Sequence, residues 1–309
     1  MSPATEERLG RLRGRVPTAA IPALVAARTR LAWSREAVRE DARAQMGFLL
    51  EHTNPEADLD EVARAYVRYQ AWRGESRWHP ELISDLPIRG FGHLAAARKQ
   101  GHGVIVSFMH HAHYEGAFAS IARSGISAQV VVYPYMLRDD APTWLKQHLN
   151  VAISGGARVI SAGIGTDALT GLLREGEVVG IASDVPGHTP VRFVGRDVVG
   201  SYGAARLSAA TSAPVVVMTS EPGDHGPVVR LHEPLQPEGY DSAKHLLQAM
   251  LDLHETAVVR WPEATDLPLS RWALPEVPTQ APARVPAQVP AQAPTHAKDT
   301  TRLGTRVAS

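Results

Sequence analysis

The sequence lacks three features: cysteine, a net charge and a long hydrophobic run. The absence of cysteine excludes disulfides, thiolate metal ligands, a cysteine nucleophile and a thioester formed on the protein itself. Lysine and arginine together number 32, as do aspartate and glutamate, so the formal net charge is zero and indicates no nucleic-acid partner. No segment approaches the ~20 apolar residues that span a bilayer. The 309 residues suffice for one large domain or two small ones.

Residues 1–34 make up a basic and apolar N-terminal segment. Its apolar stretch, 19–27, is short and contains Pro22. Four arginines precede this stretch: Arg8, Arg11, Arg13 and Arg15. We expect a surface helix rather than a signal peptide, because no cleavage site separates the stretch from the helix that follows. The basic residues fit either contact with an anionic membrane surface or a frayed amphipathic end, and both interpretations stay open.

The C-terminal end is rich in proline and alanine. From Pro278 onward a proline recurs at every fourth position as far as Pro294, with alanine, glutamine and valine between. Such a segment cannot bury enough apolar surface to fold. We therefore expect a disordered tail at 275–309 and assign 35–274 to the main domain.

Hydrophobic periodicity predicts helices first and then an alternation of helices and strands. Helices are expected at 35–51 and from Asn54-Pro55 onward, where a capping side chain precedes a proline. Strands are expected at 103–109, 129–133, 158–161, 178–183, 215–219 and 228–232, with helices between most of them. A closing helix is expected at 241–260, capped by Asp241. This order predicts an α/β fold, with a mostly parallel central sheet covered by helices and an N-terminal helical segment.

The chemistry is expected where the strand 103–109 ends. It is followed by His110, His111, His113 and Glu115, and open α/β sheets bind ligands at the carboxyl ends of their strands. In one interpretation, the Glu115 carboxylate orients the imidazole of His110, which acts as a general base.

A second interpretation makes the histidines metal ligands. His111-Ala112-His113 is a His-x-His pair, and neutral imidazole is a common zinc ligand. A zinc-dependent hydrolase using His110, His111 and His113 is therefore the alternative function.

Three further residues are candidates for binding substrate. Asp184 follows the strand 178–183, as the histidines follow theirs. Arg192 and Arg196 lie shortly after it, and arginine binds phosphate or carboxylate in a bidentate manner.

Taken together, these segments resemble the bacterial lipid A biosynthesis (late) acyltransferase family. That family includes the phosphatidylinositol mannoside acyltransferases and belongs to the wider lysophospholipid and glycerolipid acyltransferases. The resemblance runs from about residue 35 to Trp272. It rests on a glycine-rich lead-in and apolar strand at 101–107, the His-x4-Glu pair His110 and Glu115, a strand ending in Asp184, Phe193-Val194-Gly195, Ala213-Pro214-Val215, Pro262-Glu263 and Arg271-Trp272.

The resemblance implies a glycerolipid-acyltransferase-like fold and an acyl transfer without a cofactor. His110 would act as the general base on a hydroxyl or amine of a lipid or glycolipid acceptor, with Glu115 as its partner. The donor would be acyl-CoA or an acyl carrier protein. Donors for the oxyanion would be Arg192, Arg196 or backbone N–H groups at the start of the helix from Tyr114. The protein would be cytoplasmic and in peripheral contact with the inner face of the cell membrane.

Several positions depart from the family pattern. His113-Tyr114 stands where the family has Asn-Trp, and Met109 stands where it has a small residue. His111 and His113 therefore receive no role from the family. The family's arginine-rich segment is reduced to Lys146 and His148, and the membrane-spanning anchor of the lipid A members has no counterpart here. The acceptor is thus left open among lipids, glycolipids and small natural products.

Overall fold

The computed structural model describes Gly10, 12–224 and 226–272. The compact unit of the chain is Met1–Pro275. The proline-rich segment expected at 275–309 lies outside the described residues, as do residues 1–9.

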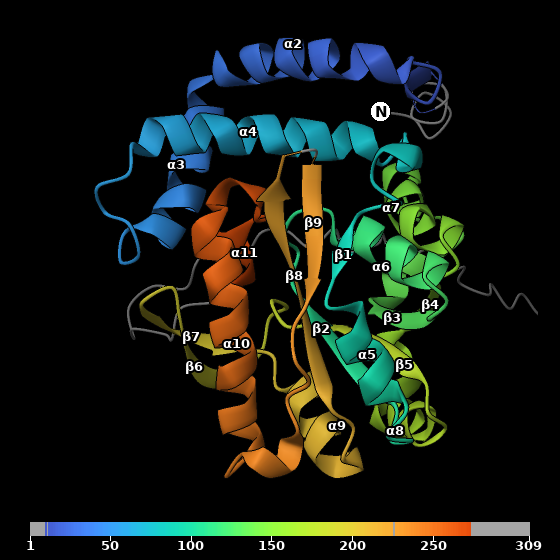
Figure 1. Ribbon diagram of the computed structural model, residues 1–309. Coiled ribbons are helices and arrows are strands. Elements are labelled where there is room, and N and C mark those ends of the chain that lie inside the picture. The colour runs from blue at the N-terminus through green and yellow to red at the C-terminus, as the bar shows by residue number, and fades with distance from the viewer. Residues whose placement is uncertain (1–9, 11, 225, 273–309) are drawn as a thin grey trace, which may run out of the picture. The chain divides into compact units, whose positions relative to one another are not determined.

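The core of the fold is a seven-stranded sheet in the order β1-β9-β8-β2-β5-β3-β4 (Figure 1). Every neighbouring pair is parallel except β8 and β9, which form an antiparallel hairpin. The mostly parallel sheet expected from the sequence is therefore confirmed. Its strands are β1 (Ile88–Arg89), β2 (Val104–Phe108), β3 (Ala128–Val132), β4 (Arg158–Ser161), β5 (Val178–Ala182), β8 (Val215–Gly223) and β9 (Gly226–Leu231).

Helices cover both faces of this sheet, as its doubly buried strands require. All five residues of β2 are buried, which is typical of a parallel strand between two helical layers. One layer contains α5 (Phe91–Arg98), α6 (Tyr114–Arg123) and α7 (Thr143–Ser154). The other contains α8 (Gly165–Arg174), α9 (Gly203–Thr211) and α10 (Ala243–Arg260). The closing helix α10 is capped by Ser242, whose hydroxyl accepts from the His245 N–H, rather than by Asp241.

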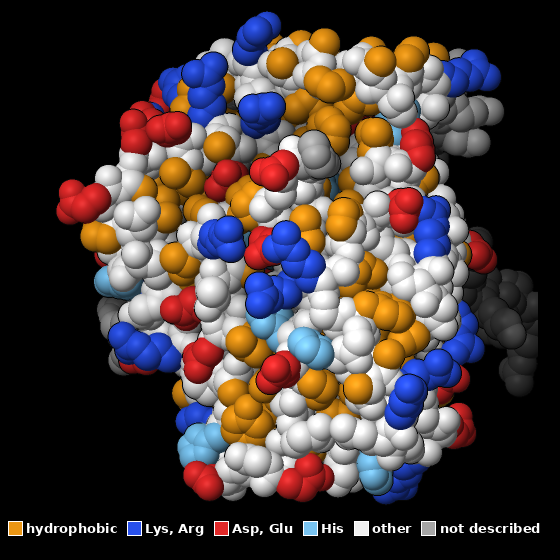
Figure 2. Space-filling model, viewed as in Figure 1, with side chains coloured by type: hydrophobic (Ala, Val, Ile, Leu, Met, Phe, Trp, Pro, Cys, Tyr) orange, Lys and Arg blue, Asp and Glu red, His pale blue; other side chains and the backbone are white. Residues whose placement is uncertain are grey.

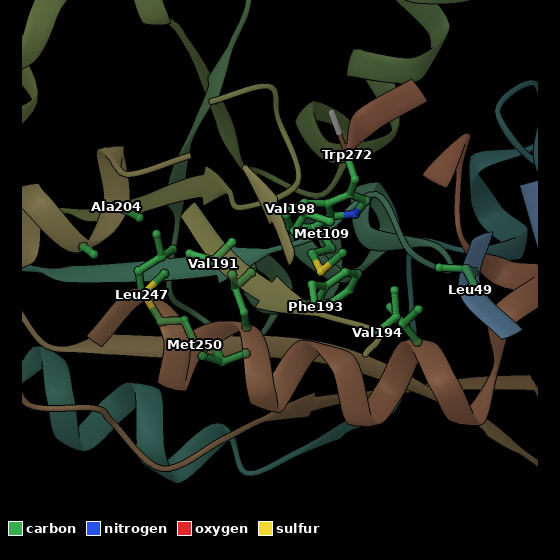
Figure 3. Close-up of a cluster of buried hydrophobic side chains, with 14 of the residues drawn as sticks. Leu49, Met109, Val191, Phe193, Val194, Val198, Ala204, Leu247, Met250 and Trp272 are labelled. Atoms are coloured by element: carbon green, nitrogen blue, oxygen red, sulfur yellow. The ribbon is translucent and has the colours of Figure 1, made fainter. Parts of the chain in front are cut away.

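Sequence periodicity did not predict the antiparallel pair of β6 (Thr189–Phe193) and β7 (Arg196–Gly200). Val194 and Gly195 form its turn with positive φ angles of 48° and 72°. The inner face of the pair joins one hydrophobic cluster, where the rings of Phe193 and Trp272 stack with centroids 4.4 Å apart. Figure 3 shows side chains from α3, β6, β7, α9 and α10 meeting in this cluster.

Three helices precede the sheet: α2 (Ile21–Trp33), α3 (Glu36–Leu50) and α4 (Leu59–Ser76). Helix α4 begins later than Asn54, because the Asp58 carboxylate accepts from the Asp60 and Glu61 N–H groups and caps it there. In Figure 1, α2 and α4 run side by side above the β8–β9 hairpin. Since α2 packs on α4, residues 21–33 belong to the same packed unit as the rest.

Short helical turns complete the described chain. They are η1 (Thr18–Ala20), η2 (Pro80–Leu82), η3 (Pro134–Leu137), η4 (Ala162–Ile164), η5 (Pro237–Gly239), η6 (Pro262–Ala264) and α11 (Pro268–Arg271). Within the described ranges, no helix has both the length and the apolar character needed to cross a membrane.

Candidate active site

The register of two neighbouring strands brings His110 and Asp184 together. Strands β2 and β5 are parallel, and Phe108 lies opposite Ala182. Two residues further on, His110 therefore faces Asp184. The Nδ1 atom of His110 lies 2.8 Å from Asp184 Oδ1, and the His110 backbone N–H donates to Oδ2 at 2.9 Å.

The environment of Asp184 keeps this carboxyl group ionised. Burial alone would raise its pKa, but the nearby charges of His110 and Arg271 and the hydrogen bonds from His110 lower the pKa to about 2. An ionised carboxylate accepts from the Nδ1–H of His110 and fixes the tautomer of the ring. The Nε2 atom of His110 is then left as the proton acceptor for a ligand.

Glu115 lies on the first turn of α6 and has other partners. Its Oε1 atom is 3.5 Å from Arg77 Nε, 3.7 Å from Arg73 Nε and 3.4 Å from His148 Nδ1. Burial would raise the pKa of Glu115, but Arg73, His148 and Arg77 hold the pKa well below its ordinary value. The structure pairs His110 with Asp184 in place of the expected partner Glu115, because the guanidinium groups of Arg73 on α4 and of Arg77, directly after α4, attract the glutamate.

An apolar cavity of about 140 Å³ lies beside His110. A cavity of about 150 Å³ lined by aliphatic and aromatic side chains is large enough to bind benzene. The walls come mainly from β3, β5, α6 and α7. Four polar side chains line the cavity near the start of α6 and in α7. Among the lining residues are His110, Tyr114, Glu115, Phe118, Val130, Val131, His148, Leu149, Ala152 and Ile181. Tyr133 also lines the cavity and is 43% exposed, so the cavity reaches the surface there.

The turn between β2 and α6 is held by η6 and by Asp266, which follows it. The Ala112 N–H donates to Ala264 O at 2.9 Å, and the Asp266 N–H donates to His110 O at 2.8 Å. Ala112 has a positive φ of 52°, a conformation that costs a residue with a Cβ roughly 1–2 kcal/mol. The contacts with η6 therefore maintain a strained turn at the site.

His111 and His113 face partners other than His110. The Nε2 atom of His111 lies 3.0 Å from Trp261 O, and Trp72 donates its indole N–H to His113 Nε2 at 3.1 Å. Burial lowers the pKa of both histidines to about 4, so both rings are neutral at pH 7. Because the three rings have three different partners, they do not converge. No group of three or more His, Asp or Glu side chains is arranged to hold a metal ion in the described part of the chain.

The structure does not bring Arg192 and Arg196 into the cavity beside His110. Arg192 is exposed on the β6–β7 pair and contacts Asp197 at 3.5 Å and Gly195 O at 3.1 Å. Arg196 donates to Phe48 O at 3.1 Å and pairs with Glu51, so it holds α3 against the β6–β7 pair. Of the predicted donors for an oxyanion, only the N–H groups at the start of α6 lie beside His110.

Charged residues that were not expected as site residues complete its surroundings. Arg73 Nη1 contacts Asp266 Oδ1 at 2.9 Å, and Asp266 Oδ2 accepts from Arg271 at 2.7 Å. Arg271 Nε in turn lies 3.6 Å from Asp184 Oδ2. Arg73 is 2% exposed and continues the apolar stripe of α4 after Tyr66 and Gln70 at helical spacing. A charged residue on such a stripe is a sequence signal for a buried ion pair.

Comparisons with known proteins give no family for this chain. No family model matches the sequence. No curated protein matches it either. Among solved structures, the crystal structure of the 1-acyl-sn-glycerophosphate (LPA) acyltransferase PlsC from Thermotoga maritima aligns with 69% of this chain and 87% of that chain, at 14% sequence identity and a TM-score of 0.38. A TM-score this low does not establish a shared fold.

Proposed function

We propose that this protein is an acyltransferase that moves an acyl group from a thioester donor to a hydroxyl or amine of a lipid or glycolipid acceptor. One observation carries the proposal: the apolar cavity is lined by His110, which is paired with the buried Asp184. A cavity with aliphatic walls suits a hydrocarbon chain. The His–Asp pair at its wall suits proton transfer at the group that the chain carries.

The proposed reaction needs no covalent intermediate on the protein. Nε2 of His110 removes the proton of the acceptor as its oxygen or nitrogen attacks the thioester carbonyl. The tetrahedral intermediate collapses, the carbon–sulfur bond breaks, and the imidazolium returns the proton to the leaving thiolate. Asp184 holds the ring in place and stabilises the imidazolium during this exchange. The N–H groups at the start of α6 are the proposed donors to the oxyanion.

Glu115 then acts through the structure of the site. Its carboxylate compensates Arg73 and Arg77 and lies 3.4 Å from His148, which accepts from or donates to the Tyr114 hydroxyl at 2.8 Å. These contacts join α4, α6 and α7 around the cavity. We therefore assign Glu115 a positioning role and assign the pairing with His110 to Asp184.

The substrates and the location of the protein are part of the same proposal. Acyl-CoA or an acyl carrier protein is the donor. The acceptor is an amphiphile that reaches the protein from the inner face of the cell membrane, with which the protein makes peripheral contact. Sedimentation with anionic vesicles, compared with neutral vesicles, tests that contact.

The direct test is transfer by the purified full chain. Acyl-CoA and acyl carrier protein are each supplied with a panel of lipid, glycolipid and small hydroxyl acceptors, and mass spectrometry detects the acylated product. We expect product with at least one pair and its loss in His110→Ala, with the fold monitored by circular dichroism. Full activity of a folded His110→Ala variant would rule out the assigned base.

A further inference from the structure

The cavity beside His110 contains a polar pair that the proposed mechanism does not use. Tyr114 and His148 both line the cavity, and the proton transfer assigned to His110 and Asp184 involves neither. Among the described side chains on the face shown in Figure 2, basic, acidic and hydrophobic groups are interspersed, a mixture that indicates no particular ligand. The pair inside the cavity is more informative, because polar groups in an apolar pocket orient what binds there.

Four contacts hold the Tyr114 ring at the reacting end of the cavity. Its centroid lies 5.2 Å from that of Phe108, on which it stacks, and 4.8 Å from that of His110, to which it stands edge to face. The guanidinium carbon of Arg73 lies 5.3 Å from the centroid of the Tyr114 ring. The Tyr114 hydroxyl lies 2.8 Å from His148 Nε2. The phenol is thus fixed beside the proposed base, and it stands where the resembled family has tryptophan, which carries no hydroxyl.

Glu115 sets the direction of the hydrogen bond between His148 and Tyr114. Burial lowers the pKa of His148 to about 4, so its ring is neutral at pH 7 and carries one N–H. The ionised Glu115 carboxylate lies 3.4 Å from His148 Nδ1, and its negative charge favours a proton on Nδ1 over a lone pair there. Nε2 is then the acceptor, and the Tyr114 hydroxyl donates to it. Burial and the charge of Glu115 raise the pKa of Tyr114, so the phenol keeps its proton.

The reacting end of the cavity therefore offers two proton acceptors. Because the O–H of Tyr114 is used by His148, the phenol oxygen accepts from a ligand rather than donating to it. Nε2 of His110 is the second acceptor, because Nδ1 is held by Asp184. Two acceptors suit an attacking atom that carries two hydrogens. A neutral primary amine has two N–H bonds, whereas a hydroxyl has one O–H bond, and burial in an apolar cavity favours the neutral form of an amine.

We propose that the acyl acceptor is a primary amine and that Tyr114 is a catalytic residue whose oxygen accepts its second N–H. The inference rests on the proposed function and narrows the acceptor from a hydroxyl or amine to an amine. As the nitrogen lone pair attacks the thioester carbonyl, one N–H proton passes to Nε2 of His110, and the other stays hydrogen-bonded to Tyr114. The carbon–sulfur bond then breaks and the imidazolium returns its proton to the thiolate. The product amide keeps the N–H that Tyr114 accepts.

The direction of the hydrogen bond is tested without any substrate. ¹⁵N NMR of the full chain labelled at histidine reports which nitrogen of each ring carries the proton, and the signals of His148 are those lost in His148→Gln. We expect the Nδ1–H form. The Nε2–H form would overturn the inference, because Tyr114 would then donate to the ligand.

The kinetic test compares octyl glycinate with octyl glycolate, two acceptors that differ only in an amine for a hydroxyl. An α-amino group has a pKa of about 8, so it is mostly neutral in an assay at about pH 8.5. We expect Tyr114→Phe to lower kcat/KM for the glycinate about five- to tenfold more than for the glycolate, the effect of one hydrogen bond. Comparing the ratio of the two acceptors between variants cancels their different nucleophilicity. Tyr69→Phe removes a buried hydroxyl that lies outside this cavity and has no partner among the described residues, and it should leave the ratio unchanged.

The outcomes separate this inference from the proposed function. Equal losses for the two acceptors in Tyr114→Phe, or the same change of ratio in Tyr69→Phe, would overturn the amine and leave the acyltransferase in place. No transfer from either donor to any acceptor would remove the acyltransferase, and calorimetry would then decide the amine site. Tighter binding of octyl glycinate than of octyl glycolate, lost in Tyr114→Phe, would support that site, and equal binding would overturn it.

Discussion

Replacing each of the two carboxylates of the site by its amide should rank the two variants in opposite orders for activity and for stability. Asp184→Asn keeps the shape of the side chain and removes the charge that holds Nδ1 of His110 at 2.8 Å. Proton transfer by a positioned base contributes roughly 10²–10⁴-fold to a rate, so kcat should fall within that range. Glu115→Gln leaves the pair of His110 and Asp184 in place and should lower kcat by less than tenfold.

The expected order of stability is the reverse. The pKa of Asp184 is lowered from 3.8 to about 2, which corresponds to about 2 kcal/mol of folding free energy near neutral pH. Glu115 is 2% exposed and compensates Arg73, which is also 2% exposed, and Arg77. Glu115→Gln leaves Arg77 without a carboxylate among its described contacts, and removing one partner of a buried ion pair costs about 3–5 kcal/mol. In Asp184→Asn, by contrast, Arg271 keeps its contact with Asp266 at 2.7 Å. Thermal unfolding should therefore occur at a lower temperature in Glu115→Gln than in Asp184→Asn.

The assay measures initial rates at saturating donor and midpoints of thermal unfolding for both variants. Asp197→Asn serves as the matched control, because Asp197 is 82% exposed on the β6–β7 pair. The reasoning fails if a folded Glu115→Gln variant loses as much kcat as Asp184→Asn. That result would mean that the glutamate contacts His110 during the reaction.

Two further predictions concern acid stability and the size of the cavity. Burial lowers the pKa of His148 to about 4 and that of His254 to about 3, as it lowers those of His111 and His113 to about 4. The unfolded chain, with an ordinary pKa near 6.5 for each, then binds more protons between pH 6.5 and 4. Above pH 6.5 these groups should not affect the free energy of unfolding, which should fall as the pH is lowered across that window, by up to about 3 kcal/mol for each. Urea unfolding at pH 7, 6 and 5 measures this free energy. A constant value would contradict the burial of these histidines in the neutral form. Ala152→Phe places a ring in the cavity of about 140 Å³ and should shift the preference of the enzyme to donors with shorter acyl chains. Rates with a series of acyl-CoA lengths measure this preference. An unchanged preference would mean that the acyl chain binds outside this cavity.

Local patterns predicted most of the elements of the fold. Helix α6 was expected to start at Tyr114 and does, and β4 was expected and found at Arg158–Ser161. These segments have clear periodicity and clear boundary residues. The β6–β7 pair was missed because its strands alternate over only five residues each, and its burial depends on Trp272, far along the chain.

The site was predictable as a location and less so as a set of contacts. His110 and Asp184 were both recognised as residues after buried strands. Their pairing follows from the adjacency of β2 and β5, which the sequence order of the strands conceals because β3 and β4 come between them in the chain. Glu115 was expected to pair with His110 because the two are close in sequence, but Arg73 of α4, outside the motif, attracts its carboxylate.

The contacts between the His110 turn and η6 set an order of assembly. His111 and Trp261 are 150 residues apart in the chain, and contacts at such separations form late in folding. During synthesis the strands β2 and β5 can pair before η6 exists, so the sheet can form before the His110 turn takes its final conformation. In the folded protein, too, the His110 turn depends on these contacts. If the end of α10 loosened, Ala112 and His110 would be released while the sheet stayed intact. Faster hydrogen exchange at the Ala112 and Asp266 amides than in β2 would report that release. Residues near the end of the described chain thus hold in place a turn that lies about 150 residues earlier in the sequence.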